Sequence, residues 1–302
     1  MGRFYADFLR FSQTANRQAE CMTSASVTRP RMAPPSMLTP TRPVATKPAS
    51  ASAVTLISQY FTGMVPATPL IQRADDACPA ATRVLLQFAD DIGYAVGYDR
   101  EQHGRLVQDI FPVRASETAQ VSSSSKVMLG SHTETAFHRH RPRYVVLLCL
   151  RGDASAATTY ADVNDIVEHL APEHLAVLQT TDFVTTVDPS FMTQGEPDAE
   201  VIVQPLTFSH GAWVLVYDEL LMRGTNERAQ TALAELHRVV KMVTQTVVLG
   251  DGDLLVIDND RAVHGRTPFV PRYDGTDRWL KRALVVRELP HGDVFGRVIQ
   301  TR

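Results

Sequence analysis

The stretch HTETAFHRHRPRYVVLLCL, residues 132–150, combines a polar motif with a long apolar run and decides the fold class. The run from Tyr144 to Leu150 has the length and the β-branched content of a buried strand. Alternate side chains of a strand share one face, so His132 and Glu134 would point to the same side if their segment is extended. The stretch therefore predicts a β-rich domain in which polar side chains face an interior.

Short strand-like segments and a few helices follow this stretch. Apolar and β-branched runs predict strands at 201–205, 213–217, 247–249, 253–258 and 282–287. Helical periodicity predicts helices at 160–170, 172–178 and 226–244. This order is not an alternating βαβ pattern, because many strands follow one another before the long helix. We expect an α+β domain with a double-stranded β-helix (jelly-roll) core and flanking helices.

The first part of the chain has a different composition. Residues 1–52 are rich in Ser, Thr, Pro and Ala and cannot bury enough apolar surface to offset their ordering entropy. We expect a disordered extension here rather than a transit peptide, since Asp7 and Glu20 are acidic. The globular domain would then span 53–302. It would open with a candidate strand at 54–61 and an amphipathic helix at 80–91.

Two histidines and one acid suggest a metal site. His132, Glu134 and the distant His264 would give two imidazoles and one carboxylate, the facial triad of non-heme iron enzymes. The motif His-x-Glu alone is weak, because many sequences contain it by chance. His138 and His140 invite a zinc reading, but His-Glu-x-x-His is not present and arginines surround both. We interpret these two as structural or substrate-pocket residues.

Two arginines follow His264 and strengthen this interpretation. Arg278 and Arg282 lie four residues apart, in and before an expected strand. A guanidinium holds a carboxylate by two parallel hydrogen bonds. Metal ligands followed by carboxylate-binding groups indicate an iron enzyme with a keto-acid cosubstrate. A zinc hydrolase could use the same three ligands, but it has no need of these arginines.

Composition excludes several function classes. The net charge of −3 gives no basic excess, so nucleic acid is not an expected partner. No apolar run approaches the ~18 residues of a membrane span. Three scattered cysteines do not make a disulfide framework, and Cys149 is expected to be a small core residue. A reducing cytoplasm is the expected compartment, and the oligomeric state is left open.

At this point the residues resemble a known family. The motif HTETAFH at 132–138 with RPRY at 141–144, and VHGRTPF at 263–269 with PRYDGTDRWLKR at 271–282, resemble the clavaminate synthase-like, TauD-type iron(II)/2-oxoglutarate oxygenases. This branch includes hydroxylases of arginine and asparagine. The resemblance covers roughly 80–288, about two thirds of the chain.

The resemblance implies a role for each matching residue. His132, Glu134 and His264 would be the iron ligands, and Arg278 would hold the distal carboxylate of 2-oxoglutarate. A hydroxyl donor to the cosubstrate falls at Thr158, with the adjacent Thr159 as its rival.

Other positions concern the substrate. Arg282 would lie near a carboxylate of cosubstrate or substrate, and Glu134 would also meet the substrate amine. Asp218 matches an acidic position that faces the substrate, although a solvated strand end explains it equally well. Arginine-specific members carry a second acid where this chain has Leu220, and Ser131 would open the pocket beside the iron. Residues 218–228 would form a lid.

The function implied is hydroxylation of an unactivated C–H, at C3, of an L-amino acid or an amino-acid-derived natural-product precursor. Iron(II) would be required as cofactor, 2-oxoglutarate and O2 would be consumed, and succinate and CO2 would be released. The intact Glu134 argues against halogenation. Desaturation, epoxidation or cyclisation use the same centre, and a non-catalytic jelly-roll binding module is the alternative from another class.

Overall fold

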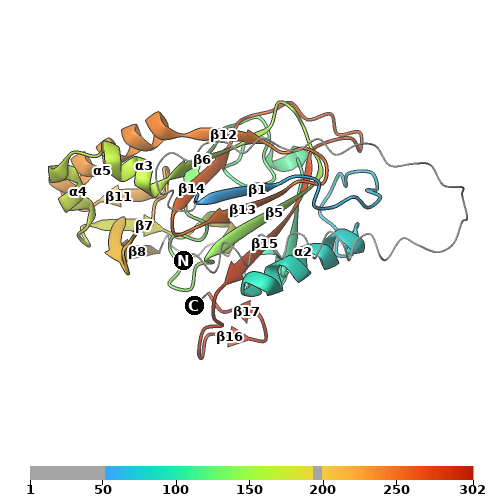
Figure 1. Cartoon of the computed structure of the whole chain (residues 1–302), viewed down its shortest axis with the longest axis horizontal. Helices are drawn as coiled ribbons and strands as arrows, with labels where there is room; N and C mark the ends of the chain where they lie inside the picture. Colours follow the sequence, from blue (N-terminus) through green and yellow to red (C-terminus); the bar gives the residue numbers. More distant parts are fainter. Residues whose placement is uncertain (1–51, 193–198, 302) are drawn as a thin grey trace, which may run out of the picture. The chain divides into compact units, whose positions relative to one another are not determined.

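The computed structural model describes residues 52–192 and 199–301. The predicted extension at 1–52 lies outside the described residues except for Ser52. The part from Ala53 onward forms one compact unit, Ala53–Arg302. It is mostly sheet with a few helices, which confirms the mixed α and β class (Figure 1).

The largest sheet is antiparallel apart from the parallel pair of β2 with β17. Its order is β1-β13-β5-β15-β2-β17-β16, and β3 pairs with the part of β15 that β2 leaves free. The strands are β1 (Val54–Ile57), β13 (Leu254–Asp258), β5 (Tyr144–Arg151), β15 (Trp279–Val286), β2 (Tyr94–Tyr98), β3 (Val107–Ile110), β17 (Val298–Ile299) and β16 (Val294–Phe295). The central strands β5 and β15 are buried almost throughout, as their apolar runs predict.

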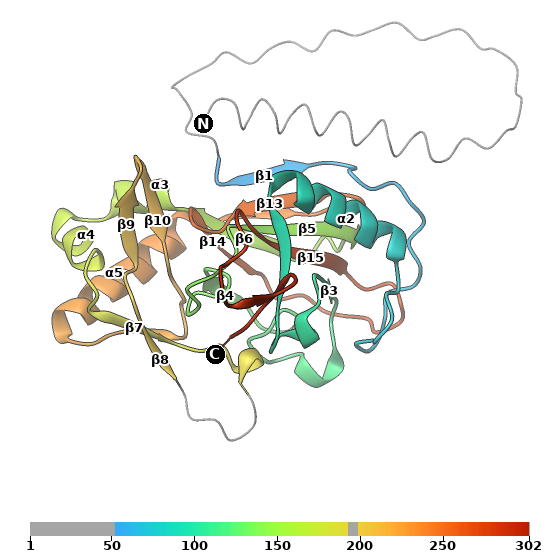
Figure 2. The same cartoon turned by 90° about the horizontal axis from the view of Figure 1, so that it is seen from below.

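A second sheet of four antiparallel strands carries much of the site. Its order is β12 (Gln245–Val248), β6 (Ala157–Asp162), β14 (Ala262–Arg266) and β4 (Leu129–His132). Two small sheets complete the β structure. They consist of β9 (Leu206–Ser209) with β10 (Ala212–Leu215), and of β11 (Met222–Gly224), β7 (Phe183–Thr186) and β8 (Glu200–Val203). Figure 2 shows these small sheets beside helices α3, α4 and α5.

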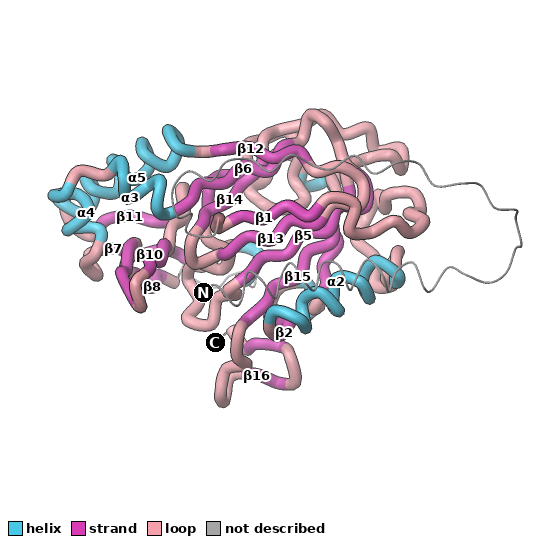
Figure 3. The backbone as a smooth tube through the Cα atoms, in the orientation of Figure 1, coloured by secondary structure: helices cyan, strands magenta, loops and turns pink. Residues whose placement is uncertain are grey.

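The helices cover the sheets at two places. Helix α2 (Pro79–Ile92) packs on β15, β2 and β5, and its first residue is a proline, which suits a helix start. Helices α3 (Val163–His169), α4 (Pro172–Leu178) and α5 (Glu227–Val243) gather at the other end (Figure 3). Short 3-10 turns lie at Gln102–Gly104, Arg114–Ser116 and Pro189–Phe191. None of these helices, within the described ranges, is long and apolar enough to cross a membrane.

Helix α5 follows the predicted pattern closely. The side chain of Asn226 accepts a hydrogen bond from the Ala229 amide and caps the first turn. Ala229, Leu233, Leu236 and Val240 are buried on one face, in the core shared with α3 and α4. A second core lies against the large sheet and contains the fully buried Cys149, as expected. Each large side chain buried there contributes about 1.5–3 kcal/mol of transfer free energy.

Two expected boundaries are wrong. The helix predicted from Tyr160 begins only at Val163, because residues 157–162 pair as β6 with strands on both sides. Asp162 then ends the strand and caps α3 by accepting from the Asn164 amide. The strand predicted from residue 282 begins already at Trp279, because Trp279, Leu280 and Lys281 also pair with β5.

Candidate metal centre and its cavity

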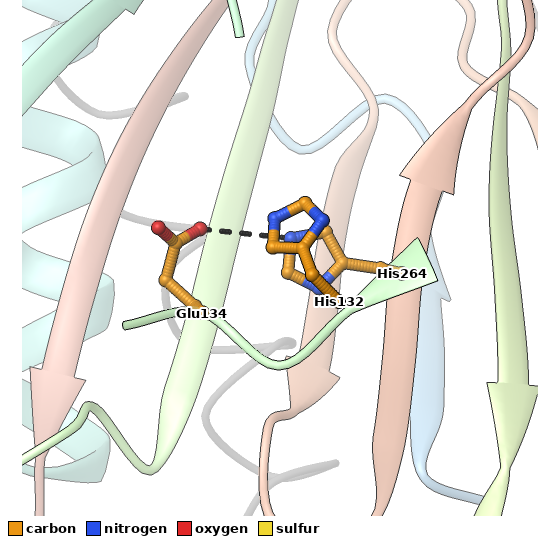
Figure 4. A group of neighbouring side chains, drawn as sticks. All are labelled: His132, Glu134 and His264. Atoms are coloured by element: carbon orange, nitrogen blue, oxygen red, sulfur yellow. Dashed lines mark ion pairs between the residues drawn. The ribbon is translucent and has the colours of Figure 1, made fainter. Parts of the chain in front are cut away.

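His132, Glu134 and His264 come together at the edge of the second sheet. His132 is the last residue of β4, His264 is its cross-strand partner in β14, and Glu134 lies two residues beyond β4. Their ligand atoms all lie within 4.8 Å of one another. Figure 4 shows the three side chains pointing toward one another, with Glu134 Oε2 3.6 Å from His264 Nε2. The structure thus assembles the predicted set, in which the chain provides three potential ligands from two neighbouring strands.

A buried asparagine holds the acid in place. The expectation that Glu134 lies in a strand is wrong, because the chain turns after His132 and Thr135 has a φ of 55°. Asn259 Oδ1 accepts from the Glu134 amide at 2.8 Å, and its Nδ2 donates to the Glu134 carbonyl at 3.1 Å. Asn259 itself is fully buried. It fastens the turn between β13 and β14 to the turn that carries Glu134.

Gly265 permits the close pairing of β14 with β4. A Cβ at this position would lie 2.5 Å from the Leu129 carbonyl oxygen and 2.9 Å from Thr159 Oγ1. The backbones of β14 and β4 therefore approach each other closely at Gly265, which has no Cβ to prevent it. The contact also shows that Thr158 and Thr159 face different surroundings. Thr158 lines the cavity, whereas Thr159 is directed at Gly265.

Arg282 is tied to Glu134. Its Nη1 donates to Glu134 Oε2 at 2.9 Å, and its Nε donates to Gln108 Oε1 at 2.9 Å. Its Nη2 donates to Glu101 and again to Gln108. The side chain is buried, so these charge-assisted bonds fix both the arginine and the carboxylate.

Arg278 is a buried cation without an acidic partner. Its hydrogen bond in the described structure is a long one of 3.4 Å from Nη2 to Thr158 Oγ1, and it forms no ion pair there. Burial lowers the pKa of Arg278 below its usual value. Arg266 lies nearby and has a pKa of about 10, lowered by burial and by Arg278. Such a position is favourable for an anion.

A cavity of about 450 Å³ joins these groups. The three candidate ligands, Thr158, Arg278 and Arg282 all line it. Asp218, Leu220 and Leu221 border it from the segment before β11, and Thr185, Asp188 and Phe191 from the segment around and after β7. Ser131 is not among its lining residues, although its neighbours Gly130 and His132 are.

Comparison with known proteins decides the family. Residues 77–284 match the family described as taurine catabolism dioxygenase TauD, TfdA family. The chain belongs to the TauD/TfdA family.

Two curated relatives are similar to this TauD/TfdA member. The L-lysine 3-hydroxylase of Catenulispora acidiphila is 37% identical over 219 residues, which cover 70% of this chain and 61% of the relative. The L-asparagine oxygenase of Streptomyces coelicolor is 38% identical over 208 residues, covering 68% and 62%. The chain thus spans about three fifths of the length of these relatives.

A solved structure of the family is similar in fold. The non-heme iron oxygenase OrfP, in complex with Fe, succinate and (3S)-hydroxy-L-Arg, has a TM-score of 0.72 and 30% identity. The match covers 79% of this chain and 78% of OrfP.

The protonation states in this TauD/TfdA site suit a divalent metal. Burial alone would raise the pKa of Glu134, but Arg282 and the two histidines hold it well below its usual range. Burial, together with His132, lowers the pKa of His264 to about 4 despite Glu134. A metal needs a deprotonated carboxylate and neutral imidazoles, and iron accepts this combination of ligands. The donor set therefore fits iron(II).

The other two histidines of the motif lie outside this group. His138 Nδ1 accepts from the His140 amide at 3.1 Å, and His140 Nε2 lies 3.3 Å from Asp293. Neither lines the cavity of the triad. Glu101, Gln108 and Asn259 are the site residues that sequence reasoning missed. Glu101 and Gln108 lie far from the motifs in the sequence, and Asn259 lies four residues before the motif at 263–269 without being part of it.

Proposed function

We propose that this chain is an iron(II)- and 2-oxoglutarate-dependent oxygenase that hydroxylates an unactivated C–H, at C3, of an L-amino acid or a related natural-product precursor. The observation that carries the proposal is the buried Arg278, which forms no ion pair within the described residues and lies in the same cavity as the two histidines and Glu134. A metal centre beside a buried cation suits a cosubstrate that is both a chelator and an anion.

The roles follow from the contacts. His132, Glu134 and His264 would hold the iron. Arg278 would bind the distal carboxylate of 2-oxoglutarate, and the neighbouring Thr158 hydroxyl would donate to the same group. The alternation of β6 supports Thr158 over Thr159 for this role.

Arg282 would act mainly through Glu134. Its hydrogen bonds to Glu134, Glu101 and Gln108 use most of its five N–H donors. Glu101 Oε2 and Gln108 Nε2 are buried beside it without a partner in the described structure. Glu101 and Gln108 do not line the cavity, so the carboxylate of an amino-acid substrate would meet this cluster through Arg282, which does.

The substrate side chain would point toward the acidic end of the cavity. Asp218 uses Oδ1 to accept from the Leu220 and Leu221 amides, both at 2.8 Å. Asp188 uses Oδ1 to accept from the Ser190 amide and hydroxyl. Within the described residues, the second oxygen of each carboxylate accepts no hydrogen bond and would be available to a ligand. Two acids favour a cationic side chain, and lysine 3-hydroxylase is among the relatives.

When bound, iron(II) and 2-oxoglutarate would activate O2, with one oxygen atom entering succinate and the other the substrate alcohol, and with release of CO2. The chain supplies position and charge. Arg282 keeps Glu134 ionised and oriented, and Arg278 anchors the cosubstrate. Apolar residues of the large sheet, among them Leu147 and Leu280, line the cavity and limit water.

We infer a jelly-roll core from the pairing of the antiparallel eight-stranded and four-stranded sheets around the cavity. The lid proposed for 218–228 rests on Leu220 and Leu221 at the cavity and on the half-exposed position of Leu220. The domain is proposed to span 53–302, with residues 1–52 as an extension. Ser131 does not line the cavity, so its proposed effect on the pocket would act through its neighbours Gly130 and His132, which do.

The test combines spectroscopy with product analysis. Iron(II) and 2-oxoglutarate are added without oxygen, and the weak visible charge-transfer band of a chelated keto acid is monitored. A panel of L-amino acids is then scored for succinate and for a mass increase of one oxygen atom. A band and a hydroxylated basic amino acid are expected. Iron loading without a band would leave a zinc hydrolase or a binding module as the better explanation.

A further inference from the structure

The segment Tyr217-Asp218-Glu219 closes the free edge of β4. The Glu219 amide donates to the Ser131 carbonyl at 3.0 Å, and the Thr133 amide donates to the Tyr217 carbonyl at 2.7 Å. Between these bonds, Asp218 is the bridge partner of His132. Because β4 is the end strand of its sheet, this segment fixes the edge that carries His132.

The side chains of this segment alternate between two sides. Asp218 lines the cavity. The Tyr217 hydroxyl lies 2.6 Å from His237 Nδ1, and Glu219 Oε1 lies 3.0 Å from Lys241 Nζ. His237 and Lys241 are four residues apart, so they lie on one face of α5. One helix face therefore holds both neighbours of Asp218.

The protonation states of these side chains allow the hydrogen bonds and the ion pair that they form. Burial raises the pKa of Tyr217, so the phenol stays protonated and donates. Burial lowers the pKa of His237, which leaves a neutral ring able to accept. Burial opposes ionisation of Glu219, but Lys241 and the Ser131 amide lower its pKa. The other oxygen of Glu219 accepts from the Ser131 amide at 3.1 Å.

We propose that His237 and Lys241 of α5 are positioning residues, which set from outside the cavity where Asp218 and the strand of His132 lie. This rests on the proposed function of the cavity. Neither residue lines the cavity. Their two contacts fall on either side of Asp218, and the residues held in turn, Ser131 and Thr133, fall on either side of His132. A displacement of α5 therefore reaches both the substrate side chain and the metal ligand.

The variant Lys241→Met tests the exposed contact, since it removes the ammonium and keeps most of the aliphatic stem. We expect more succinate per hydroxylated product and a rise of about two- to fivefold in KM for the amino acid, the scale of a partly exposed ion pair. The KM for 2-oxoglutarate should not change, because Thr158 lies in β6 and Arg278 directly precedes β15, and neither belongs to the Tyr217–Glu219 segment or to α5. Lys241→Arg should restore the wild-type ratio of succinate to product.

The matched control is Arg238→Met on the same helix. Arg238 is exposed and pairs with Glu235, away from the segment. Amide hydrogen exchange of the metal-free protein gives a second readout. Exchange at 131–133 and 217–219 should be faster in Lys241→Met and unchanged in Arg238→Met. Unchanged exchange in Lys241→Met would overturn the inference. If exchange is faster in Lys241→Met but the wild-type protein releases no succinate, only the proposed function is overturned.

Discussion

Arg278 directly precedes strand β15 and Arg282 lies within it, and although both side chains line the cavity, their surroundings differ. In the described structure, Arg282 donates hydrogen bonds to two carboxylates and a glutamine, whereas the Arg278 guanidinium donates to a threonine hydroxyl at 3.4 Å. Period-two alternation explains why both reach the cavity, together with Leu280 between them. Their separate roles depend on Glu101 and Gln108, which no spacing in the sequence links to them.

The first prediction concerns Arg278. Arg278→Met should raise the KM for 2-oxoglutarate about a hundredfold, because a buried carboxylate loses its charged partner at a cost of about 2–5 kcal/mol. Iron binding should stay near the wild-type level, since Arg278 does not contact the triad. Thr158→Val removes one neutral hydrogen bond and should cost about 0.5–1.5 kcal/mol, roughly tenfold or less. Steady-state kinetics with varied 2-oxoglutarate measure both. An unchanged requirement in Arg278→Met would contradict the assignment.

The second prediction concerns the pH dependence of stability through His237. Burial, with Lys241 next to it, lowers its pKa from 6.5, although Glu219 and Asp218 act in the opposite direction. The unfolded chain therefore binds a proton more readily than the folded one. The stability from this group is complete above pH 6.5 and is lost as the pH falls through its folded pKa.

Urea unfolding between about pH 8 and about pH 5 measures this dependence. The variant His237→Gln keeps an acceptor for Tyr217 but does not titrate, so its unfolding free energy should fall less over the same range. Burial lowers the pKa of His138 in the same direction, and a residual slope should remain. An identical slope in both proteins would exclude His237 as a contributor.

At the level of elements, helices and strands whose sequences show one clear pattern were predicted best. Helix α5 and strand β5 were found because a buried face or an apolar run repeats along each. Strand β6 was missed because its Thr-Thr-Tyr-Ala sequence runs directly into α3. Its strand conformation depends on hydrogen bonds to β12 and β14, about 85–110 residues away in the chain. Tertiary pairing overrides local pattern there.

The third prediction concerns strand β15, whose outer face carries a buried lysine. Lys281 Nζ donates to Asp109 at 2.9 Å and to Asp76 at 2.8 Å, and the Trp279 indole also donates to Asp109. Lys281→Met leaves a buried carboxylate with one donor fewer and should lower the unfolding free energy by about 3–5 kcal/mol. Because Lys281 alternates away from the cavity, kcat of the folded variant should stay close to wild type.

Denaturant unfolding and kinetics at low temperature separate the two effects. Asp76→Asn is a matched comparison, since the Asp76 side chain is partly exposed and the Asp109 contact remains. Asp76→Asn should lower the unfolding free energy much less than Lys281→Met does. A Lys281→Met protein of wild-type stability would show that this buried pair is no better than an apolar contact.

At the scale of the whole domain, the site lies between two sheets, and the strands of each sheet come from separate parts of the chain. The three candidate ligands belong to the β4–β14 side, whereas Arg282 lies in β15 of the large sheet and Arg278 is the residue directly before that strand. The residue types of the triad could be read from the sequence, because each motif is short. The meeting of residues 132 and 264 could not, since it depends on a strand pairing across more than a hundred residues.

The last prediction follows from this arrangement. Iron(II) should stabilise the domain by itself, and 2-oxoglutarate should stabilise it only after the metal has bound. Iron(II) added without oxygen at a hundredfold excess over its Kd should raise the unfolding free energy by about 2.7 kcal/mol, or roughly 5–10 °C in Tm. Adding 2-oxoglutarate should raise Tm further only when the metal is bound, because chelation and the Arg278 contact act together. Arg278→Met should keep the metal increment and lose that of 2-oxoglutarate, whereas His132→Ala should lose both. A zinc hydrolase with these ligands would gain nothing from 2-oxoglutarate, and an equal increment in metal-free protein would argue against a joint site.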